Sequence, residues 1–167
     1  GPVELISRAA PNGDFPNAGL RPSFNTASQL SADGRLLLFS SGSDDLVPGD
    51  ANHASDVFLR DLRTGVTRLV SVNAAGTGSG SGYSTYPVMS GDGRWIAFAS
   101  RATNLTAEAG VPSGNLFLRD MVAGVTTLVS TNSTGAPLGS SAEFPPAISP
   151  SGAWVAFILS RSSLIVA

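Results

Sequence analysis

The chain has 167 residues, 42% of them hydrophobic, which is enough for one domain with a sizeable core. Only 13% are charged, with 12 acids against 10 arginines and no lysine, so the net charge of −2 argues against a basic nucleic-acid-binding surface. The absence of cysteine excludes disulfides and thiol catalysis, 19 glycines and 11 prolines leave little room for long helices, and no apolar run reaches the roughly 20 residues of a membrane span.

The N-terminal residues are interpreted as two short pieces. Gly1 and Pro2 are typical of the remainder of a cleaved tag, so a natural signal peptide would have been removed with it. Residues 3–23 contain the run ELIS at residues 4–7, which is similar to the end of a block that returns twice further along the chain. We therefore expect residues 3–23 to hold the last strand of a preceding unit and a loop.

Residues 24–72 are predicted to form the first complete unit. They contain the segment SADGRLLLFS at residues 31–40 and the segment VFLRD at residues 57–61, followed by GVTRLVS. Short apolar runs bounded by turn residues favour strands over helices. The Asp-Gly and Thr-Gly pairs between them supply the positive φ that tight hairpins require.

Residues 73–131 repeat both segments 59 positions later, as SGDGRWIAFA, LFLRD and GVTTLVS, after a linking loop. Four strands are expected, near residues 86–90, 94–100, 116–120 and 125–131. Two tight hairpins join them into an up-and-down four-stranded antiparallel sheet.

Residues 132–167 contain the first segment once more, as SPSGAWVAFI, again 59 positions further on. The second segment does not follow, and the chain stops within the apolar run of residues 162–167. We interpret these residues as a linker loop and the first half of a third unit, and the whole chain as an excised piece.

The repeated segments resemble the TolB-like, WD40-like propeller repeats called PD40, in their longer-period bacterial version. The pattern S-x-D-G-R-x-ϕ-A-F at residues 90–98 and the pattern D-V-F-ϕ-R-D-x-x-T-G-x-T at residues 56–67 carry the resemblance, which covers nearly the whole chain. It implies an all-β fold made of β-propeller blades, each a four-stranded up-and-down sheet. The fold alone does not specify a function.

The units add up to about 2.75 blades and eleven strands, whereas propellers close with at least four blades. We therefore expect an open arc, or an arc completed by self-association. The strand at residues 155–160 would be an uncovered apolar edge, and such an edge invites pairing with another chain. The predicted partners are a second copy, or a protein that covers the open edges.

The strongest candidate site is the loop before the VFLRD strand of the first unit. Asp50, Asn52 and Asp56 place oxygen atoms at positions 1, 3 and 7 of a loop that could wrap a hard cation, with Asp44 and Asp45 close by. Calcium is the cation that such oxygens prefer, although the Gly and Glu of a calcium loop are missing at positions 6 and 12. In the alternative interpretation Asp50 and Asn52 form Asx-turns and Asp56 caps the following strand. No other cofactor is predicted.

No catalytic residue is predicted. His53 is the only histidine, and the sequence holds no Gly-x-Ser-x-Gly elbow, so we expect His53 to be a surface residue. The repeated pairs Arg60-Asp61 and Arg119-Asp120 are interpreted as structural. Each Asp would accept from backbone amides of the next turn, and each Arg would pair with a neighbouring blade.

The aromatic residues divide into core and rim candidates. Five phenylalanines recur at equivalent strand positions and are assigned to the core between blades: Phe39, Phe58, Phe98, Phe117 and Phe157. Trp95 and Trp154 follow the hairpin turns, while Tyr83 and Tyr86 belong to a glycine-rich loop, and these four are the binding candidates at a rim. The glycines of that loop, at positions 76, 78, 80 and 82, predict a flexible segment that partner binding would have to order.

The leading functional hypothesis is a non-enzymatic propeller segment that acts as a binding or assembly scaffold through its rim loops. The alternative is the propeller portion of a larger peptidase-like enzyme whose catalytic domain lies outside this chain, which a Gly-x-Ser-x-Gly elbow further along the gene would favour. In a third interpretation the chain is a piece of a repeat protein, and its main property is that part of a propeller can fold or oligomerise. The resemblance implies a bacterial protein outside the cytoplasm, in the periplasm or secreted.

Overall fold

The structure is a computed structural model that describes residues 28–108, 111–139, 145–159 and 163–166. Within these ranges the chain is all-β, with eleven strands and no helix. The strand expected within residues 3–23 and the interpretation of Gly1 and Pro2 fall outside the described residues.

Two four-stranded antiparallel sheets have the same up-and-down order. The first contains β1 (Ser28–Leu30), β2 (Leu36–Ser41), β3 (Asp56–Asp61) and β4 (Thr67–Leu69), and the second contains β5 (Ser84–Met89), β6 (Trp95–Ser100), β7 (Asn115–Asp120) and β8 (Val125–Leu128). Their central registers agree at the spacing of the repeat, since Phe39 pairs with Phe58 and Phe98 with Phe117. These sheets are the two complete blades that the repeats predict.

The turn between the first two strands of each sheet is fixed by its own side chains. In the first sheet Asp33 Oδ1 accepts hydrogen bonds from the Ser31 hydroxyl (2.6 Å) and the Arg35 N–H (3.0 Å), while Gly34 has a φ of 69°. Asp92 makes the equivalent contacts in the second sheet. The Ser-x-Asp-Gly-Arg segment is therefore a hairpin signal, as predicted.

The third sheet corrects one expectation. β9 (Ala147–Ile148) and β10 (Val155–Leu159) form the expected hairpin, but β11 (Ser163–Val166) pairs antiparallel along the other side of β10. The strand predicted as an uncovered edge is thus the centre of a three-stranded sheet, and β11 is the edge. Sequence reasoning missed β11 because its pairing depends on a short connection after β10 that matches neither earlier unit.

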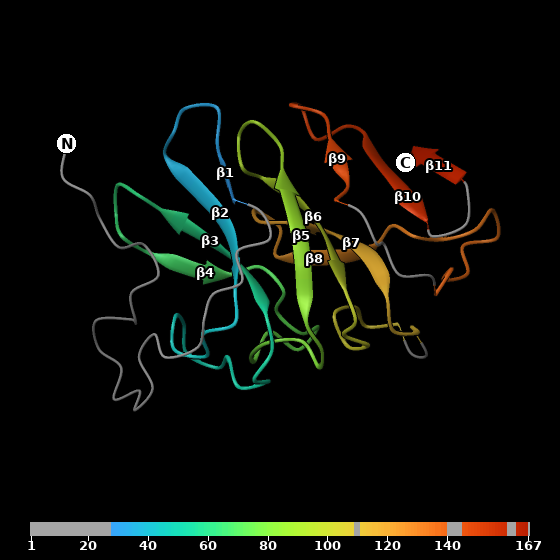
Figure 1. Cartoon of the computed structure of the whole chain (residues 1–167), viewed down its shortest axis with the longest axis horizontal. Coiled ribbons are helices and arrows are strands. Elements are labelled where there is room, and N and C mark those ends of the chain that lie inside the picture. Colours follow the sequence, from blue (N-terminus) through green and yellow to red (C-terminus); the bar gives the residue numbers. More distant parts are fainter. Residues whose placement is uncertain (1–27, 109–110, 140–144, 160–162, 167) are drawn as a thin grey trace.

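The three sheets stack side by side as an arc of blades (Figure 1). Side chains alternate along β6, so Ile96 and Phe98 join the cluster shared with the first sheet, while Ala97 and Ala99 join a second cluster with Val155 and Phe157 of β10. The described phenylalanines of all three units are buried, as predicted: Phe39, Phe58, Phe98, Phe117 and Phe157. The core therefore lies between the sheets, as in a propeller.

The first hairpins of the three sheets are linked in a row. Ala32 N–H donates to the Gly91 carbonyl and Gly91 N–H donates to the Pro150 carbonyl, both at 2.8 Å. Gly93 packs on Leu36 of the preceding sheet, and Gly152 packs in the same way on Trp95. Each blade thus rests on its neighbour through a glycine that leaves room for a large apolar side chain.

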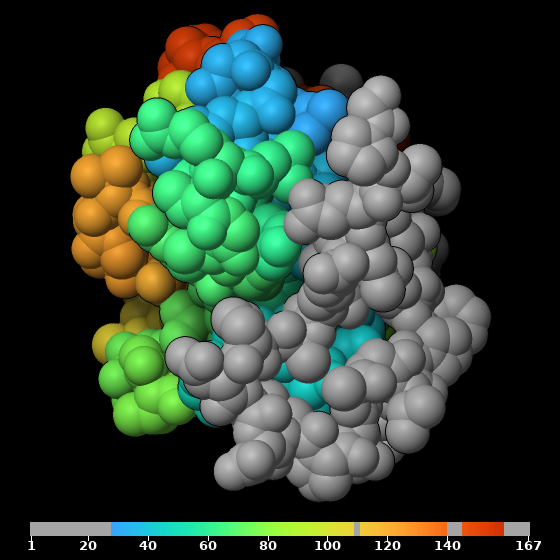
Figure 2. Space-filling view, turned by 90° about the vertical axis from the view of Figure 1, so that its left-hand side faces the viewer, coloured from blue at the N-terminus to red at the C-terminus, as the bar shows by residue number. Residues whose placement is uncertain are grey.

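The connections between strands form two rims, one at each end of the strands, and the two rims differ in construction. The hairpin rim consists of the tight turns at residues 31–35, 62–66, 90–94, 121–124 and 149–153, and the loop rim consists of residues 42–55, 70–83 and 101–108. In Figure 2 the blue β1–β2 hairpin is at the top, and the green loop that follows β4 is at the bottom. The described residues include no helix that is long and apolar enough to cross a membrane.

Candidate functional site

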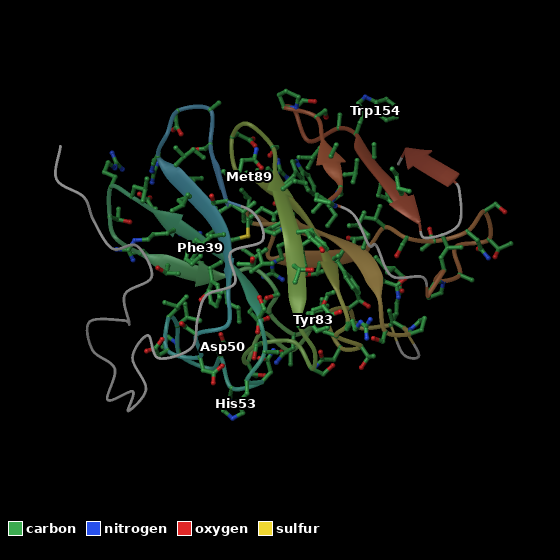
Figure 3. All side chains as sticks on the ribbon, viewed as in Figure 1. Phe39, Asp50, His53, Tyr83, Met89 and Trp154 are labelled. Atoms are coloured by element: carbon green, nitrogen blue, oxygen red, sulfur yellow. The ribbon has the colours of Figure 1, made fainter. Side chains whose placement is uncertain are left out.

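The predicted binding residues do not gather at one place. Trp154 lies at the hairpin rim, at the opposite end of the molecule from Asp50 and His53 on the loop rim (Figure 3). Trp95, at the start of β6, is on the hairpin rim and is half-buried, whereas Tyr83 is 42% exposed on the loop rim and faces the Arg101 guanidinium at 5.3 Å. The rim candidates therefore belong to two separate surfaces.

Tyr86 is not a rim residue. It lies within β5, at a register shift between Thr85 and Val88, and packs against the cluster shared by the second and third sheets. Its φ of 52° is unusual for a residue other than glycine. The strand boundary explains the correction, because β5 starts before Tyr86, at Ser84.

The glycine-rich loop after β4 packs closely against neighbouring loops at three of its four glycines. If a Cβ atom were added to Gly78, it would collide with the backbone of Gly49. At Gly80 it would collide with the side chains of Leu105 and Ala102, and at Gly82 with the backbone of Arg101. Backbone hydrogen bonds also tie this loop to the neighbouring loops, from Ala74 N–H to Asn104 O and from Ser79 N–H to Gly49 O. Gly78, Gly80 and Gly82 therefore permit close packing between the loops of this rim, whereas a Cβ atom at Gly76 would meet nothing within 4 Å.

Asp50, Asn52 and Asp56 do come together on the loop rim. The Asn52 side-chain amide donates to Asp56 Oδ2 (2.7 Å) and to the Gly80 carbonyl (2.9 Å), and its Oδ1 accepts from Ala54 N–H as in an Asx-turn. Asp56 is fully buried and accepts a second hydrogen bond from the Ser71 hydroxyl at 2.5 Å. Asp50 is only 6% exposed. The loop therefore combines the Asx-turn of one interpretation with the buried oxygens of the other.

Burial changes the acidity of this loop. It raises the pKa of Asp50 to about 6 and that of Asp56 to about 7; the negative charge of Asp44 adds to both shifts, and that of Asp50 adds to the shift of Asp56. The Ser79 hydroxyl lowers the pKa of Asp50 in part, although the two groups are not aligned as a hydrogen bond. Among the described residues, no three His, Asp or Glu side chains form a metal-binding group.

His53 lies at the surface, as expected. Its side chain is 69% exposed, its φ is 55°, and its Nδ1 contacts Asp44 Oδ2 at 2.5 Å. Within the described ranges no serine hydroxyl forms a hydrogen bond with His53. The geometry is that of a surface contact between an imidazole and a carboxylate rather than of a nucleophile and its base.

The repeated Arg-Asp pairs make contacts within their own blades. Asp120 Oδ1 accepts from Val122 and Ala123 N–H, as predicted, but Arg119 donates to Thr126 of the same sheet at 3.0 Å rather than reaching a neighbouring blade. Arg60 and Asp61 make the corresponding contacts in the first blade with residues 63, 64 and 67.

Sequence reasoning did not predict the partners of the hairpin arginines, Arg35 and Arg94, which follow the Asp-Gly turns. Arg35 pairs with Asp61 Oδ2 at 2.5 Å, and Arg94 pairs with Asp120 Oδ2 at 2.8 Å. The arginine and the aspartate of each pair both recur 59 positions later, and this recurrence could have indicated that they interact. In the third unit Ala153 replaces the arginine. Arg35 lowers the pKa of Asp61 to about 2, and Arg94 lowers that of Asp120 further.

An open cavity of about 320 Å³ lies between the first two blades on the hairpin rim. Its lining includes both hairpin arginines together with Arg68, Asp61 and Asp92. Because each hairpin arginine is already paired with a carboxylate, the cavity is not a concentrated positive site.

Comparison with known proteins supports the fold. No protein-family model matches the chain, and no curated protein sequence matches it. TolB from Acinetobacter baumannii is similar in structure, with 19% identity and a TM-score of 0.52 over 83% of this chain and 28% of that one. A structure assigned to TolB from Agrobacterium tumefaciens gives 18% identity and a TM-score of 0.50 over 86% of this chain and 46% of that one.

The chain spans less than half the length of either of these TolB structures. At this level of identity the likeness concerns the fold alone. Together with the repeated antiparallel sheets, it identifies the fold as a TolB-like β-propeller fold, of which this chain forms part.

Proposed function

We propose that this chain is a non-catalytic β-propeller segment that acts as a binding and assembly scaffold, and that the outward face of its third sheet contacts a second copy. The observation that carries the proposal is the 64% exposure of Trp154, whereas the equivalent Trp95 is half-buried beneath Gly152 of the next hairpin. A large apolar side chain that stays mostly exposed in the part of the chain that the structure describes is typical of a contact surface.

The exposed face of β10 is apolar along its length. Val155 and Phe157 point toward the second sheet and are buried, so Trp154, Ala156 and Ile158 lie on the opposite face. Ile158 is 43% exposed. In the second blade the corresponding face is covered by the third sheet. Because the third sheet has the same alternation of side chains, its exposed face is suited to a partner in the same position.

The second copy would use the same face, related by a two-fold axis. A head-to-tail contact would need the outer side of the first sheet, but Phe39 and Phe58 there are already buried in a cluster with Leu46. Such a contact also could not extend the row of hairpin hydrogen bonds, because Pro150 has no N–H to donate. A self-complementary two-fold contact requires neither surface and can pair the β11 edges.

The non-catalytic part of the proposal is supported by His53. Its exposure and its contact with Asp44 leave it without the arrangement of a general base beside a nucleophile. The loop rim provides a second binding surface in this proposal, with Tyr83 as the aromatic residue that a partner would contact.

Sedimentation velocity over a range of protein concentrations tests the assembly. We expect the wild-type chain to shift from monomer to dimer mass as concentration rises, and Trp154→Ser to stay monomeric with an unchanged melting temperature. Val122→Ser is the matched control, because Val122 is 76% exposed on the β7–β8 hairpin, away from the third sheet. It should dimerise like the wild type.

Two results would contradict the proposed contact. A wild-type chain that stays monomeric at every concentration would remove the need for a partner copy. Dimerisation of Trp154→Ser equal to that of the wild type would place the interface elsewhere. Membership of the PD40 family and a location outside the cytoplasm stay predictions, the latter to be checked by fusing the full-length gene product to a periplasmic reporter.

A further inference from the structure

One side chain in the fold is buried without the contacts that normally accompany burial. Asp50 is 6% exposed, and among the described residues neither of its carboxylate oxygens has a hydrogen-bond partner. Burial of a polar group is unfavourable unless a partner compensates for the lost water, and the cost is larger for a carboxylate. Asp50 therefore needs a partner that the described residues do not supply.

A second buried carboxylate faces the first. Asp56 is fully buried beside Asp50, and the two act on each other's ionisation, with Asp44 as a further negative neighbour. The basic group that acts on Asp50 is His53, which is largely exposed and already paired with Asp44. Two acidic groups in one buried place are stable together when a cation or a shared proton neutralises them.

The surrounding atoms are oxygen donors of the kind that a hard cation binds. The Ser79 hydroxyl lies next to Asp50, and one Asn52 side-chain nitrogen donates both to Asp56 Oδ2 and to the Gly80 carbonyl, so these two oxygens lie near each other. The Ser55 hydroxyl is buried with no hydrogen-bond partner among the described residues. Thiolate ligands are absent from the sequence, which contains no cysteine. Such a set suits calcium, which takes six to eight oxygens in flexible geometry, better than it suits magnesium or a transition metal.

The second blade shows what this loop looks like without an acidic pair. Asn115 replaces Asp56, and its Oδ1 accepts from the Ser130 hydroxyl (2.7 Å) and from Gly139 N–H (3.3 Å), while its Nδ2 donates to the Pro112 carbonyl. In the sequence, Ala109 stands where the first blade has Asp50. Asn115 thus has partners for both ends of its amide, whereas neither oxygen of Asp50 has a hydrogen-bond partner among the described residues.

From these observations we propose that the loop rim of the first blade binds one calcium ion, with Asp50 and Asp56 as its carboxylate ligands. The ion would join the loop before β3 to the loop after β4, because Ser79 and Gly80 belong to the latter. The expected stoichiometry is one ion per chain, since only the first blade has the acidic pair.

Isothermal titration calorimetry of the metal-stripped chain at pH 7.5, with CaCl₂ and separately with MgCl₂, tests the proposal. We expect one Ca²⁺ per chain, binding of Mg²⁺ at least tenfold weaker, and a tenfold or greater loss of Ca²⁺ affinity in Asp50→Asn. Asp92→Asn is the matched control, because Asp92 is a surface carboxylate on the opposite rim, and it should bind Ca²⁺ like the wild type.

Thermal melting in EDTA and in excess Ca²⁺ gives a second readout, because a ligand of the native state raises the melting temperature. The increase should occur in the wild type and in Asp92→Asn and be lost in Asp50→Asn. If Ca²⁺ gives the wild type neither heat of binding nor a higher melting temperature, the calcium site is overturned. A proton shared by Asp50 and Asp56 would then account for the burial of both carboxyls. Unchanged Ca²⁺ binding by Asp50→Asn would equally overturn the calcium site, and Mg²⁺ binding as tight as that of Ca²⁺ would overturn the choice of calcium.

Discussion

At the scale of single residues, Asp56 and Asn115 show how one repeated position takes two chemistries. Both begin the third strand of a blade, and both accept a hydrogen bond from a buried serine hydroxyl, Ser71 or Ser130. That serine in turn accepts from the next backbone N–H, of Val57 or Leu116. The serine hydroxyl makes the same two hydrogen bonds in both blades, whereas the acceptor differs in charge and in its other partners.

Replacing these serines by alanine should separate the two chemistries. Each change removes a hydroxyl that joins two buried groups, so Ser71→Ala and Ser130→Ala should each lower the free energy of unfolding by about 1–3 kcal/mol. The cost of Ser71→Ala should be larger at pH 8 than at pH 5, because Asp56 then carries its charge with one donor fewer. Urea unfolding in EDTA measures both, and an equal cost of Ser71→Ala at the two pH values would contradict this role.

At the scale of elements, the glycines of the first hairpins connect turn geometry with blade packing. Gly34, Gly93 and Gly152 have φ values of 69°, 71° and 75°. A Cβ atom would meet nothing within 4 Å at Gly34, the end of the flexible Leu36 side chain at Gly93, and the ring of Trp95 at Gly152. Only the second and third glycines therefore serve both the turn and the contact with the preceding sheet.

Alanine substitution at the three glycines should produce a graded loss of stability. All three variants bear the cost of a positive φ, about 1 kcal/mol. Gly93→Ala should lose somewhat more, and Gly152→Ala should lose most, about 1–3 kcal/mol beyond the loss in Gly34→Ala, because a rigid indole cannot move aside easily. Thermal unfolding of the three variants measures the order, and equal losses would show that the hairpins do not bear on the neighbouring sheets.

At the scale of the whole molecule, the two rims have opposite acid-base behaviour. On the hairpin rim, arginines hold the pKa of Asp61 at about 2 and lower that of Asp120. On the loop rim, burial raises the pKa of Asp50 to about 6 and that of Asp56 to about 7. Since the ordinary value is 3.8, the folded chain binds fewer protons than the unfolded chain below about pH 4, and more protons between about pH 4 and 7.

The free energy of unfolding in EDTA should therefore rise from pH 2 to about pH 4 and then fall towards pH 8. The fall reflects the ionisation of Asp50 and Asp56, is on the order of 7 kcal/mol, and should be smaller in Asp50→Asn. Calcium should remove it if the ion binds as proposed. Urea unfolding at a series of pH values provides the measurement, and a continuous rise in stability up to pH 8 would contradict the raised pKa values.

Much of the fold could be predicted because its signals are local and repeated. The Ser-x-Asp-Gly-Arg hairpin fixes its own turn through Asp33 and Gly34, and the 59-residue spacing then fixes the next copies. β11 and the position of Tyr86 escaped prediction because each depends on strand pairing rather than on a local pattern. For the candidate site, the sequence grouped Asp50, Asn52 and Asp56 correctly but gave no indication of their burial.

The sequence by itself determined the β-blade architecture, the period and the number of complete blades, because alternating side chains and tight turns act over a few residues. Only the tertiary structure decided which surfaces stay open, because exposure depends on what the neighbouring sheet covers. Trp95 and Trp154 are the same residue in the same motif, yet one lies under a glycine hairpin and the other faces solvent. In the same way, packing between two loops removed Asp50 from water and left its oxygens without a hydrogen bond among the described residues.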